Sequence, residues 1–284
     1  MTAHSAKAAA MALVEEPGSA RILAGGTDLL VQMKAGNLAV DLVVDIKHIP
    51  GIRAITPEAG GFRIGAAVSS AELGEHSGVC ALWPGVVEAA KLIGSTQVQG
   101  RCTMAGNLCN GSPAGDSVPA LVAADAIVRV EGPNGVRDLP VMAIPTGPGK
   151  TALTRGDVVT SILLPARPPH SADAYLRFIP RTEMDIAVAS AAVSLTLDAS
   201  GTVTAVRVAL GAVAPKVLLV DAAAAAILGT KLDDAALAAL TTACEAACTP
   251  IDDKRGTIAF RTSTAGVLAR RAALIAYARA GGSK

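Results

Sequence analysis

A cluster of three prolines in the five residues Pro165–Pro169 divides the sequence into two halves with different patterns. In the first half, short apolar stretches alternate with glycine-containing turns, which is typical of short strands and their connecting loops. In the second half, two long runs rich in Val and Ala precede helical sequence. Because clustered prolines commonly mark linkers, residues 1–168 and 169–284 are predicted to form separate domains, the second of the α+β class.

Local patterns predict several individual elements. The strands expected in the first half are Arg21–Ala24, Leu42–Ile46, the alternating stretch Phe62–Val68, Ala126–Val130 and Val158–Leu164. A helix is expected over Pro84–Ile93, where proline suits the helix start. The second half is expected to contain a hairpin of Ile186–Leu197 and Val203–Val213, a helix from Asp233 through Ala247, and a closing helix over Gly256–Ala278.

The composition describes a packed globular protein with few aromatic side chains. Of the 284 residues, 51% are hydrophobic, 17% are charged and 2% are aromatic, so the core is expected to consist of Ala, Val, Ile and Leu. The formal net charge of +1 argues against a basic surface for nucleic acid. No stretch approaches the roughly 20 apolar residues that span a bilayer, so no membrane span is expected.

The N-terminal stretch Ala8–Val14 is apolar and faintly resembles the hydrophobic part of a signal peptide. It runs directly into Glu15, Glu16 and Pro17, and it lacks the small-residue cleavage pattern of a secreted protein. We therefore predict that the protein is cytoplasmic.

The five cysteines and four histidines form no metal-binding pattern. Cys102 and Cys109 flank a glycine-rich segment, and Cys244 and Cys248 lie one helical turn apart, but neither pair has a second pair of ligands near it. An odd number of cysteines in a long chain also does not indicate a disulfide framework. Structural or incidental thiols and no metal site are therefore expected.

Two glycine-rich segments are the strongest candidates for a ligand site. The first, Leu23–Leu30, runs through Gly25 and Gly26 into an apolar helical stretch, and the second begins with Thr103–Leu108 and continues to Asp116. Glycine lets the backbone adopt positive φ and approach a ligand closely, so that successive amides can point at one anion. Together the segments are predicted to grip a diphosphate from both sides, with Asp116 accepting hydrogen bonds from a sugar or a base edge.

The glycine segments do not by themselves identify a ligand, and two plain tight turns are the competing interpretation. Gly147–Thr151 ends like a phosphate-binding loop, but Ile144 stands where that motif requires glycine. The sequence also contains no Gly-x-Gly-x-x-Gly pattern. Nucleotide hydrolysis and an NAD site of the Rossmann type are therefore disfavoured.

Five segments, in this order, resemble the FAD-binding medium subunit of the xanthine dehydrogenase and carbon monoxide dehydrogenase family, the molybdenum hydroxylases. They are Leu23–Leu30; Thr103–Asn107 with Ser112, Pro113 and Asp116; Tyr175–Ala187; Ala209–Pro215; and Pro250–Asp253. The resemblance extends from about residue 20 to about residue 275. It implies an α+β fold, in which a two-part FAD-binding domain of the p-cresol methylhydroxylase (PCMH)/vanillyl-alcohol-oxidase type precedes a C-terminal domain of β-sheet and helices.

The resemblance also implies roles for individual residues. Those assigned to FAD binding are Leu23, Ala24, Gly25, Gly26, Thr27, Asp28 and Leu29 in the first segment, Thr103, Met104, Ala105, Gly106 and Asn107 in the second, and Ser112, Asp116, Val159 and Arg177 elsewhere. Amides of the two segments are expected to enclose the FAD diphosphate. Asp116 is expected to bind the nucleotide part and Val159 to lie beside the ring system. Arg177 is expected near the isoalloxazine, where a cation favours a reduced, anionic flavin.

The implied function is electron transfer, and no catalytic acid, base or nucleophile is implied in this chain. Electrons would come from [2Fe–2S] clusters of a small partner subunit, while the molybdenum cofactor and the substrate pocket would belong to a large partner subunit. FAD would pass the electrons to an external acceptor. The implied assembly is a dimer of heterotrimers, and the sequence determines neither the substrate nor the acceptor.

The sequence departs from the family pattern at several positions. Ala105 precedes Gly106 where glycine is usual, which adds a methyl group at a point of close approach to the ligand. Gly111 stands where alanine is common, and the part before Gly18 is short and lacks the usual aromatic opening strand. No insertion with extra cysteines separates the FAD segments, so the additional iron–sulfur cluster of some relatives is not expected.

Two other functions are compatible with these residues. A stand-alone FAD-dependent reductase of the same cofactor-binding fold would need its own proton donor, for which Glu183 and Asp185 are the available acids. A non-catalytic interaction module, whose glycine segments are only turns, would bind no nucleotide. Bound FAD, and flavin reduction that depends on partner subunits, distinguish the three functions.

Overall fold

The N-terminal part is built on a small parallel strand pair. In the computed structural model, which describes residues 1–283, β1 (Ala20–Leu23) pairs with β2 (Leu42–Asp45). Helix α1 (Ala6–Glu15) is capped by the Ser5 side chain and packs its buried alanines against β2, β5 and β9. Helix α2 (Leu29–Lys34) directly follows the first glycine segment and buries none of its residues. The apolar stretch near the N-terminus is thus a packed helix.

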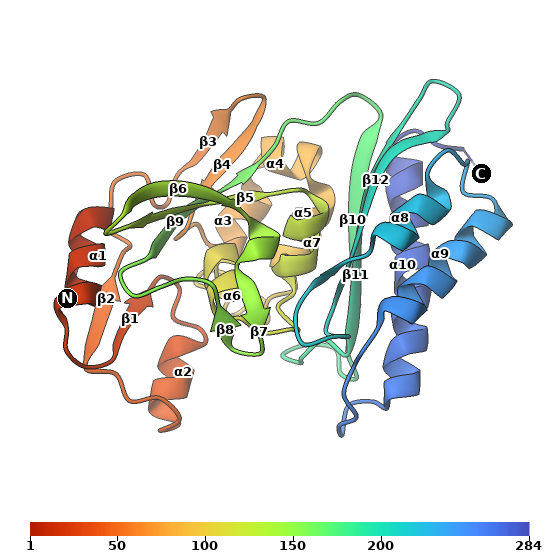
Figure 1. Ribbon diagram of the computed structural model, residues 1–284. Coiled ribbons are helices and arrows are strands. Elements are labelled where there is room, and N and C mark those ends of the chain that lie inside the picture. The colour runs from red at the N-terminus through yellow and green to blue at the C-terminus, as the bar shows by residue number, and fades with distance from the viewer. Residues whose placement is uncertain (284) are drawn as a thin grey trace.

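A five-stranded antiparallel sheet occupies the centre of the N-terminal half (Figure 1). Its order is β3 (Ile55–Glu58), β4 (Gly61–Gly65), β9 (Val158–Leu164), β5 (Ile127–Gly132) and β6 (Gly135–Pro140). The helices that follow β4 are α3 (Ser70–Glu75), α4 (Ser77–Leu82), α5 (Pro84–Lys91), α6 (Met104–Cys109) and α7 (Ser117–Ala123). A 3₁₀ turn (Val141–Ala143) leads to the hairpin of β7 (Pro145–Gly147) and β8 (Lys150–Thr151).

The C-terminal half is a four-stranded antiparallel sheet with helices on both faces (Figure 1). The strands, in spatial order, are β10 (Ser171–Phe178), β11 (Ala189–Leu197), β12 (Val203–Gly211) and β13 (Leu218–Leu219). The outer face is covered by α8 (Asp221–Ile227), α9 (Asp234–Ala247) and α10 (Ile258–Arg279). Helices α5 and α7 of the N-terminal half pack on the inner face, so the sheet also supports the second glycine segment.

Several elements agree with the sequence patterns. Strand β9 has the predicted bounds, and α9 begins after its predicted cap, Asp233, and ends at Ala247. The hairpin of β11 and β12 is confirmed, although β11 begins at Ala189 rather than Ile186. These elements carry strong local signals, namely a run rich in Val, Ile and Leu, a turn sequence and a capping side chain.

The predicted strand Phe62–Val68 is wrong beyond Gly65, where β4 ends. Gly65 packs directly on the backbone of Ile52, because a Cβ placed at residue 65 would lie 2.3 Å from the Ile52 carbonyl oxygen. The chain bends at this contact, and the amide of Ala67 donates to the same carbonyl. The glycine-rich part from residue 94 to 119 also contains α6 and the start of α7, two helices that its composition did not predict.

A buried arginine joins the two halves. Arg167 pairs with Asp173 at 2.9 Å, and both side chains are about 95% buried, with exposed fractions of 4% and 5%. The guanidinium lies 4.0 Å from the centre of the Trp83 ring, and it also donates to the Leu82 carbonyl. Asp173 in turn accepts a hydrogen bond from the amide of Val86 in α5. This cluster links α4 and α5 to the edge strand of the C-terminal sheet.

Candidate cofactor-binding site

The two glycine segments lie on one cavity of about 790 Å³. Residues 24–29 line it from the turn between β1 and α2, and Thr103, Ala105, Gly106 and Asn107 line it from the start of α6. The cavity volume falls in the range of cofactor clefts, roughly 300–1,000 Å³. The predicted convergence of the two segments, which are far apart in the sequence, is therefore present in the fold.

Gly25 is the point where the first segment touches the backbone immediately before the second segment. A Cβ atom at residue 25 would lie 2.0 Å from the carbonyl oxygen of Arg101 and 3.2 Å from the Cα of Cys102. The Arg101 Nε also donates to the Gly25 carbonyl at 3.3 Å. Since no side chain fits between these backbones, glycine at this position brings the segments together.

Gly26 turns the chain from β1 into α2. Its φ is +79°, in the left-handed region that glycine adopts without strain. Its carbonyl accepts the hydrogen bond from the amide of Leu30 that begins the helix. The turn therefore places residues 24–29, between β1 and the start of α2, along the wall of the cavity.

Unpaired backbone amides gather on both sides of the cavity. Within residues 1–283, the amides of residues 24–29 and 103–105 donate to no protein acceptor. The next amide, that of Gly106, is capped by the Thr103 hydroxyl at 2.9 Å. Successive free N–H groups form a concave site for an anion, and a helix start adds favourable partial charge. A diphosphate fits this arrangement.

One acidic side chain lies among these amides. Asp28 lines the cavity, and burial raises the pKa of its carboxyl above the usual range. A raised pKa means that the ionised carboxylate is disfavoured at this position. The first segment therefore offers hydrogen-bond donors from its backbone, together with one carboxyl whose pKa burial raises.

Another part of the cavity wall comes from the segment before β9, which the sequence patterns did not indicate. Thr151, Leu153, Thr154, Arg155, Gly156 and Asp157 line the cavity there. Arg155 donates to the Leu13 carbonyl at 2.8 Å, and Asp157 accepts from the Thr154 amide at 2.7 Å. The Thr-Arg-Gly-Asp turn just before a buried strand was the available signal, but only the tertiary structure brings it to the same cavity as the glycine segments.

The predicted site residues divide into two groups. Those that line the cavity are Ala24, Gly25, Gly26, Thr27, Asp28, Leu29, Thr103, Ala105, Gly106, Asn107 and Val159. Leu23, Met104, Ser112, Asp116 and Arg177 are not part of its wall. Met104 points into the core, and the Ser112 hydroxyl accepts from the amide of Ala114.

Asp116 and Arg177 bind each other. The guanidinium of Arg177 donates to Asp116 Oδ2 at 2.6 Å, and the Tyr175 hydroxyl donates to Oδ1 at 2.9 Å. The Arg177 and Asp116 side chains are both buried. Arg177 is therefore paired with Asp116 and buried where β10 packs against the start of α7.

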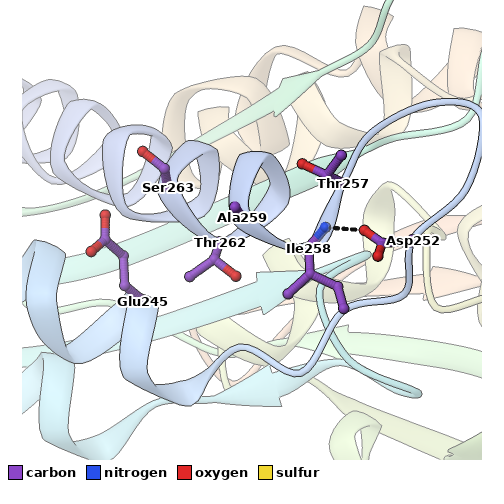
Figure 2. Close-up of a pocket in the computed structure, with 7 residues that line it drawn as sticks. All are labelled: Glu245, Asp252, Thr257, Ile258, Ala259, Thr262 and Ser263. Carbon is purple, nitrogen blue, oxygen red and sulfur yellow. Dashed lines mark hydrogen bonds between the residues drawn. The ribbon is translucent and has the colours of Figure 1, made fainter.

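A second hollow, of about 670 Å³, lies at the start of α10 (Figure 2). Its wall consists of Glu245, Asp252, Thr257, Ile258, Ala259, Thr262 and Ser263. Asp252 accepts a hydrogen bond from the amide of Ile258, and the Thr257 side chain accepts one from the amide of Phe260, so these groups cap the helix. None of the predicted site residues lies here, and the described residues contain no cluster of three or more potential metal ligands.

Two family models match the two halves of the chain. The family described as "FAD binding domain in molybdopterin dehydrogenase" matches residues 2–167, and "CO dehydrogenase flavoprotein C-terminal domain" matches residues 174–276. The cavity with its two glycine segments lies within the first match. The N-terminal half is thus an FAD-binding domain, and its free amides suit the FAD diphosphate.

Curated relatives and solved structures agree with these matches. The chain is 35% identical over 271 residues to the carbon monoxide dehydrogenase medium chain of Hydrogenophaga pseudoflava, covering 95% of this chain and 94% of the relative. It is 34% identical over 208 residues to the xanthine dehydrogenase FAD-binding subunit of Escherichia coli O157:H7, covering 72% of this chain and 71% of the relative. The structure of the Hydrogenophaga pseudoflava dehydrogenase lacking its Mo-pyranopterin moiety has a TM-score of 0.93 at 35% identity, covering 98% of this chain and 96% of that one.

The chain belongs to the family of FAD-binding medium subunits of the molybdenum hydroxylases, which includes the carbon monoxide and xanthine dehydrogenases. It is a flavoprotein of the oxidoreductase class. The expected fold class, an FAD-binding domain followed by a C-terminal domain of β-sheet and helices, is confirmed.

FAD is expected to protect the Cys109 thiol from alkylation. Cys109 is exposed and lines the cavity, so an alkylating reagent can reach its thiol when the cavity is empty. At FAD concentrations about ten times the dissociation constant, the labelling rate should fall about tenfold, because little empty cavity remains. Mass spectrometry measures this rate, and the half-buried Cys248 is the control that FAD should leave unchanged. Equal labelling of Cys109 with and without FAD would contradict the assignment of the cavity.

Proposed function

We propose that this chain is the electron-transfer subunit of a molybdenum hydroxylase. It takes electrons from [2Fe–2S] clusters of a small partner subunit and passes them to an external acceptor. The observation that carries the proposal is the convergence of free amides from two distant glycine segments on one cavity, in a chain of this family. A bound flavin accepts electrons singly and releases them in pairs, which connects one-electron clusters to a two-electron acceptor.

The protein's own groups bind and orient the cofactor. The amides of residues 24–29 and 103–105 hold the diphosphate, and Val159 of β9 lies beside the ring system. The contacts predicted for Asp116 with the nucleotide and for Arg177 with the isoalloxazine stay predictions, because both side chains lie outside the cavity wall. No side chain is assigned as an acid, base or nucleophile, since the proposed role requires no proton transfer by this chain.

The partners follow from the same proposal. The molybdenum cofactor and the substrate pocket belong to a large partner subunit, and the complex is a dimer of heterotrimers. We also propose that the two domains meet at residues 168 and 169 and that the complex is cytoplasmic. Among residues 1–283, the structure has no helix that is both long and apolar enough to cross a membrane.

Co-purification with the neighbouring subunits tests the function. The chain, expressed together with the products of adjacent genes, should yield a complex with the absorption bands of FAD and of iron–sulfur clusters. Upon addition of the complex's substrate, the flavin band should bleach only when both partners are present. A colourless chain that takes up no FAD would overturn the proposal, and flavin reduction by substrate in the isolated chain would favour a stand-alone reductase.

A further inference from the structure

The orientation of the Asn107 side chain is set by one neighbouring residue. Asn107 Oδ1 accepts hydrogen bonds from the Ser117 amide at 3.1 Å and from the Ser117 hydroxyl at 2.8 Å. A backbone N–H can only donate, so the atom facing Ser117 must be the amide oxygen and not the nitrogen. The NH₂ group therefore points the other way. Asn107 lines the cavity, and within residues 1–283 its NH₂ has no acceptor.

Ser117 is in turn held in place by the C-terminal sheet. It is fully buried at the first position of α7, immediately after Asp116. The Asp116 carboxylate is clamped by the Tyr175 hydroxyl and the Arg177 guanidinium, both from β10. A continuous set of hydrogen bonds and one peptide bond thus connects the inner face of the C-terminal sheet to the wall of the cavity.

We propose that Ser117 is a positioning residue, which fixes the Asn107 amide so that its NH₂ donates to an acceptor oxygen of the bound FAD. Tyr175 and Arg177 support Ser117 through Asp116. This inference rests on the proposed function, because it assigns FAD to the cavity. A fixed donor loses little conformational entropy when the ligand binds, so the network strengthens FAD binding without touching FAD.

Three variants of the full chain test this network, each titrated with FAD after removal of bound flavin. Asn107→Asp keeps an oxygen for Ser117 but replaces the donor with an acceptor, and FAD should bind at least about tenfold more weakly. Ser117→Ala removes the hydroxyl bond and should weaken FAD about fivefold. Tyr175→Phe removes one hydrogen bond to Asp116 and should also weaken FAD binding, by a smaller factor than Ser117→Ala.

Tyr277→Phe is the matched control. The Tyr277 side chain is buried in the same C-terminal half, and its hydroxyl donates to the Gly201 carbonyl at 2.7 Å. The Tyr277→Phe variant loses a hydroxyl group, as Tyr175→Phe does, but Tyr277 has no connection to the cavity wall. Both variants should lose similar thermal stability, yet only Tyr175→Phe should change the FAD dissociation constant and the flavin circular dichroism. A purely structural network would leave both of these readouts unchanged.

The double variant Asn107→Asp with Ser117→Ala completes the test. Because Ser117 acts through Asn107, its removal should have little further effect once the donor is lost, so the two effects should be non-additive. Additive effects, or wild-type FAD affinity in both Ser117→Ala and Tyr175→Phe, would overturn the inference while leaving the proposed function intact. A wild-type chain that binds no FAD would overturn both.

Discussion

Replacing Gly25 with alanine is expected to weaken FAD binding about 10- to 100-fold. The added Cβ would stand 2.0 Å from the Arg101 carbonyl oxygen and 2.8 Å from its carbon, so one of the two backbones must move. Because the obstacle is backbone rather than a flexible side chain, movement separates the two glycine segments and their free amides. Titration of the apoprotein with FAD, followed by flavin fluorescence, measures the change.

Gly100→Ala is the control for this prediction. Residue 100 directly precedes Arg101, yet a Cβ there meets no heavy atom within 4 Å, and its φ lies outside the left-handed region. FAD affinity should therefore stay near that of the unaltered protein. If Gly25→Ala bound FAD as tightly as Gly100→Ala, the close contact of the two segments would not be needed for the site.

Arg167→Met is expected to lower the free energy of unfolding by about 3–5 kcal/mol. Methionine keeps much of the apolar contact with Trp83 but leaves the Asp173 carboxylate buried without its partner. Loss of a partner from a buried ion pair costs far more than the pair itself contributes, because the remaining charge is not solvated. Urea denaturation of the apoprotein, followed by circular dichroism, measures the change.

Arg129→Met is the corresponding control on the surface. Arg129 pairs with Asp138 at 2.8 Å, but their side chains are 35% and 41% exposed, so water solvates both charges. Removal of such a pair is expected to cost about 1 kcal/mol or less. Equal losses in the two variants would show that the buried cluster does not hold the two halves together.

Local signals account for the parts of the fold that were predicted well. In β9 and β11 nearly all strand residues are buried, so sequence rich in Val, Ile, Leu and Ala marks them, and the turn sequence between β11 and β12 marks their hairpin. Helix α9 has a side-chain cap at Asp233, which is visible in the sequence. Helix α1 also begins after a capping side chain, that of Ser5, but its apolar stretch was weighed only against a signal peptide, and no helix was predicted there; its buried alanines pack on β2, β5 and β9.

Local signals also explain why only some residues of the site were predicted. The sequence shows some site residues by their type, namely Gly25, Gly26 and Thr103. Close backbone approach and positive φ favour glycine, and helix capping favours threonine. Arg155 and Asp157 carry no such mark, although they line the cavity. The pairing of Asp116 with Arg177 is equally invisible in the sequence, since it depends on how β10 packs against α7.

The sequence by itself determined the two glycine segments, the ordered motifs that resemble the medium subunits, and the strands and helices with strong local signals. Only the tertiary structure decided which residues face the cavity and which acids and bases neutralise each other. The physical reason is range: backbone conformation depends on neighbouring residues, whereas burial and ion pairing depend on contacts between residues that are distant along the chain. The contact of Gly25 with Arg101 requires both a glycine at position 25 and a fold that brings the residues just before the second segment against it.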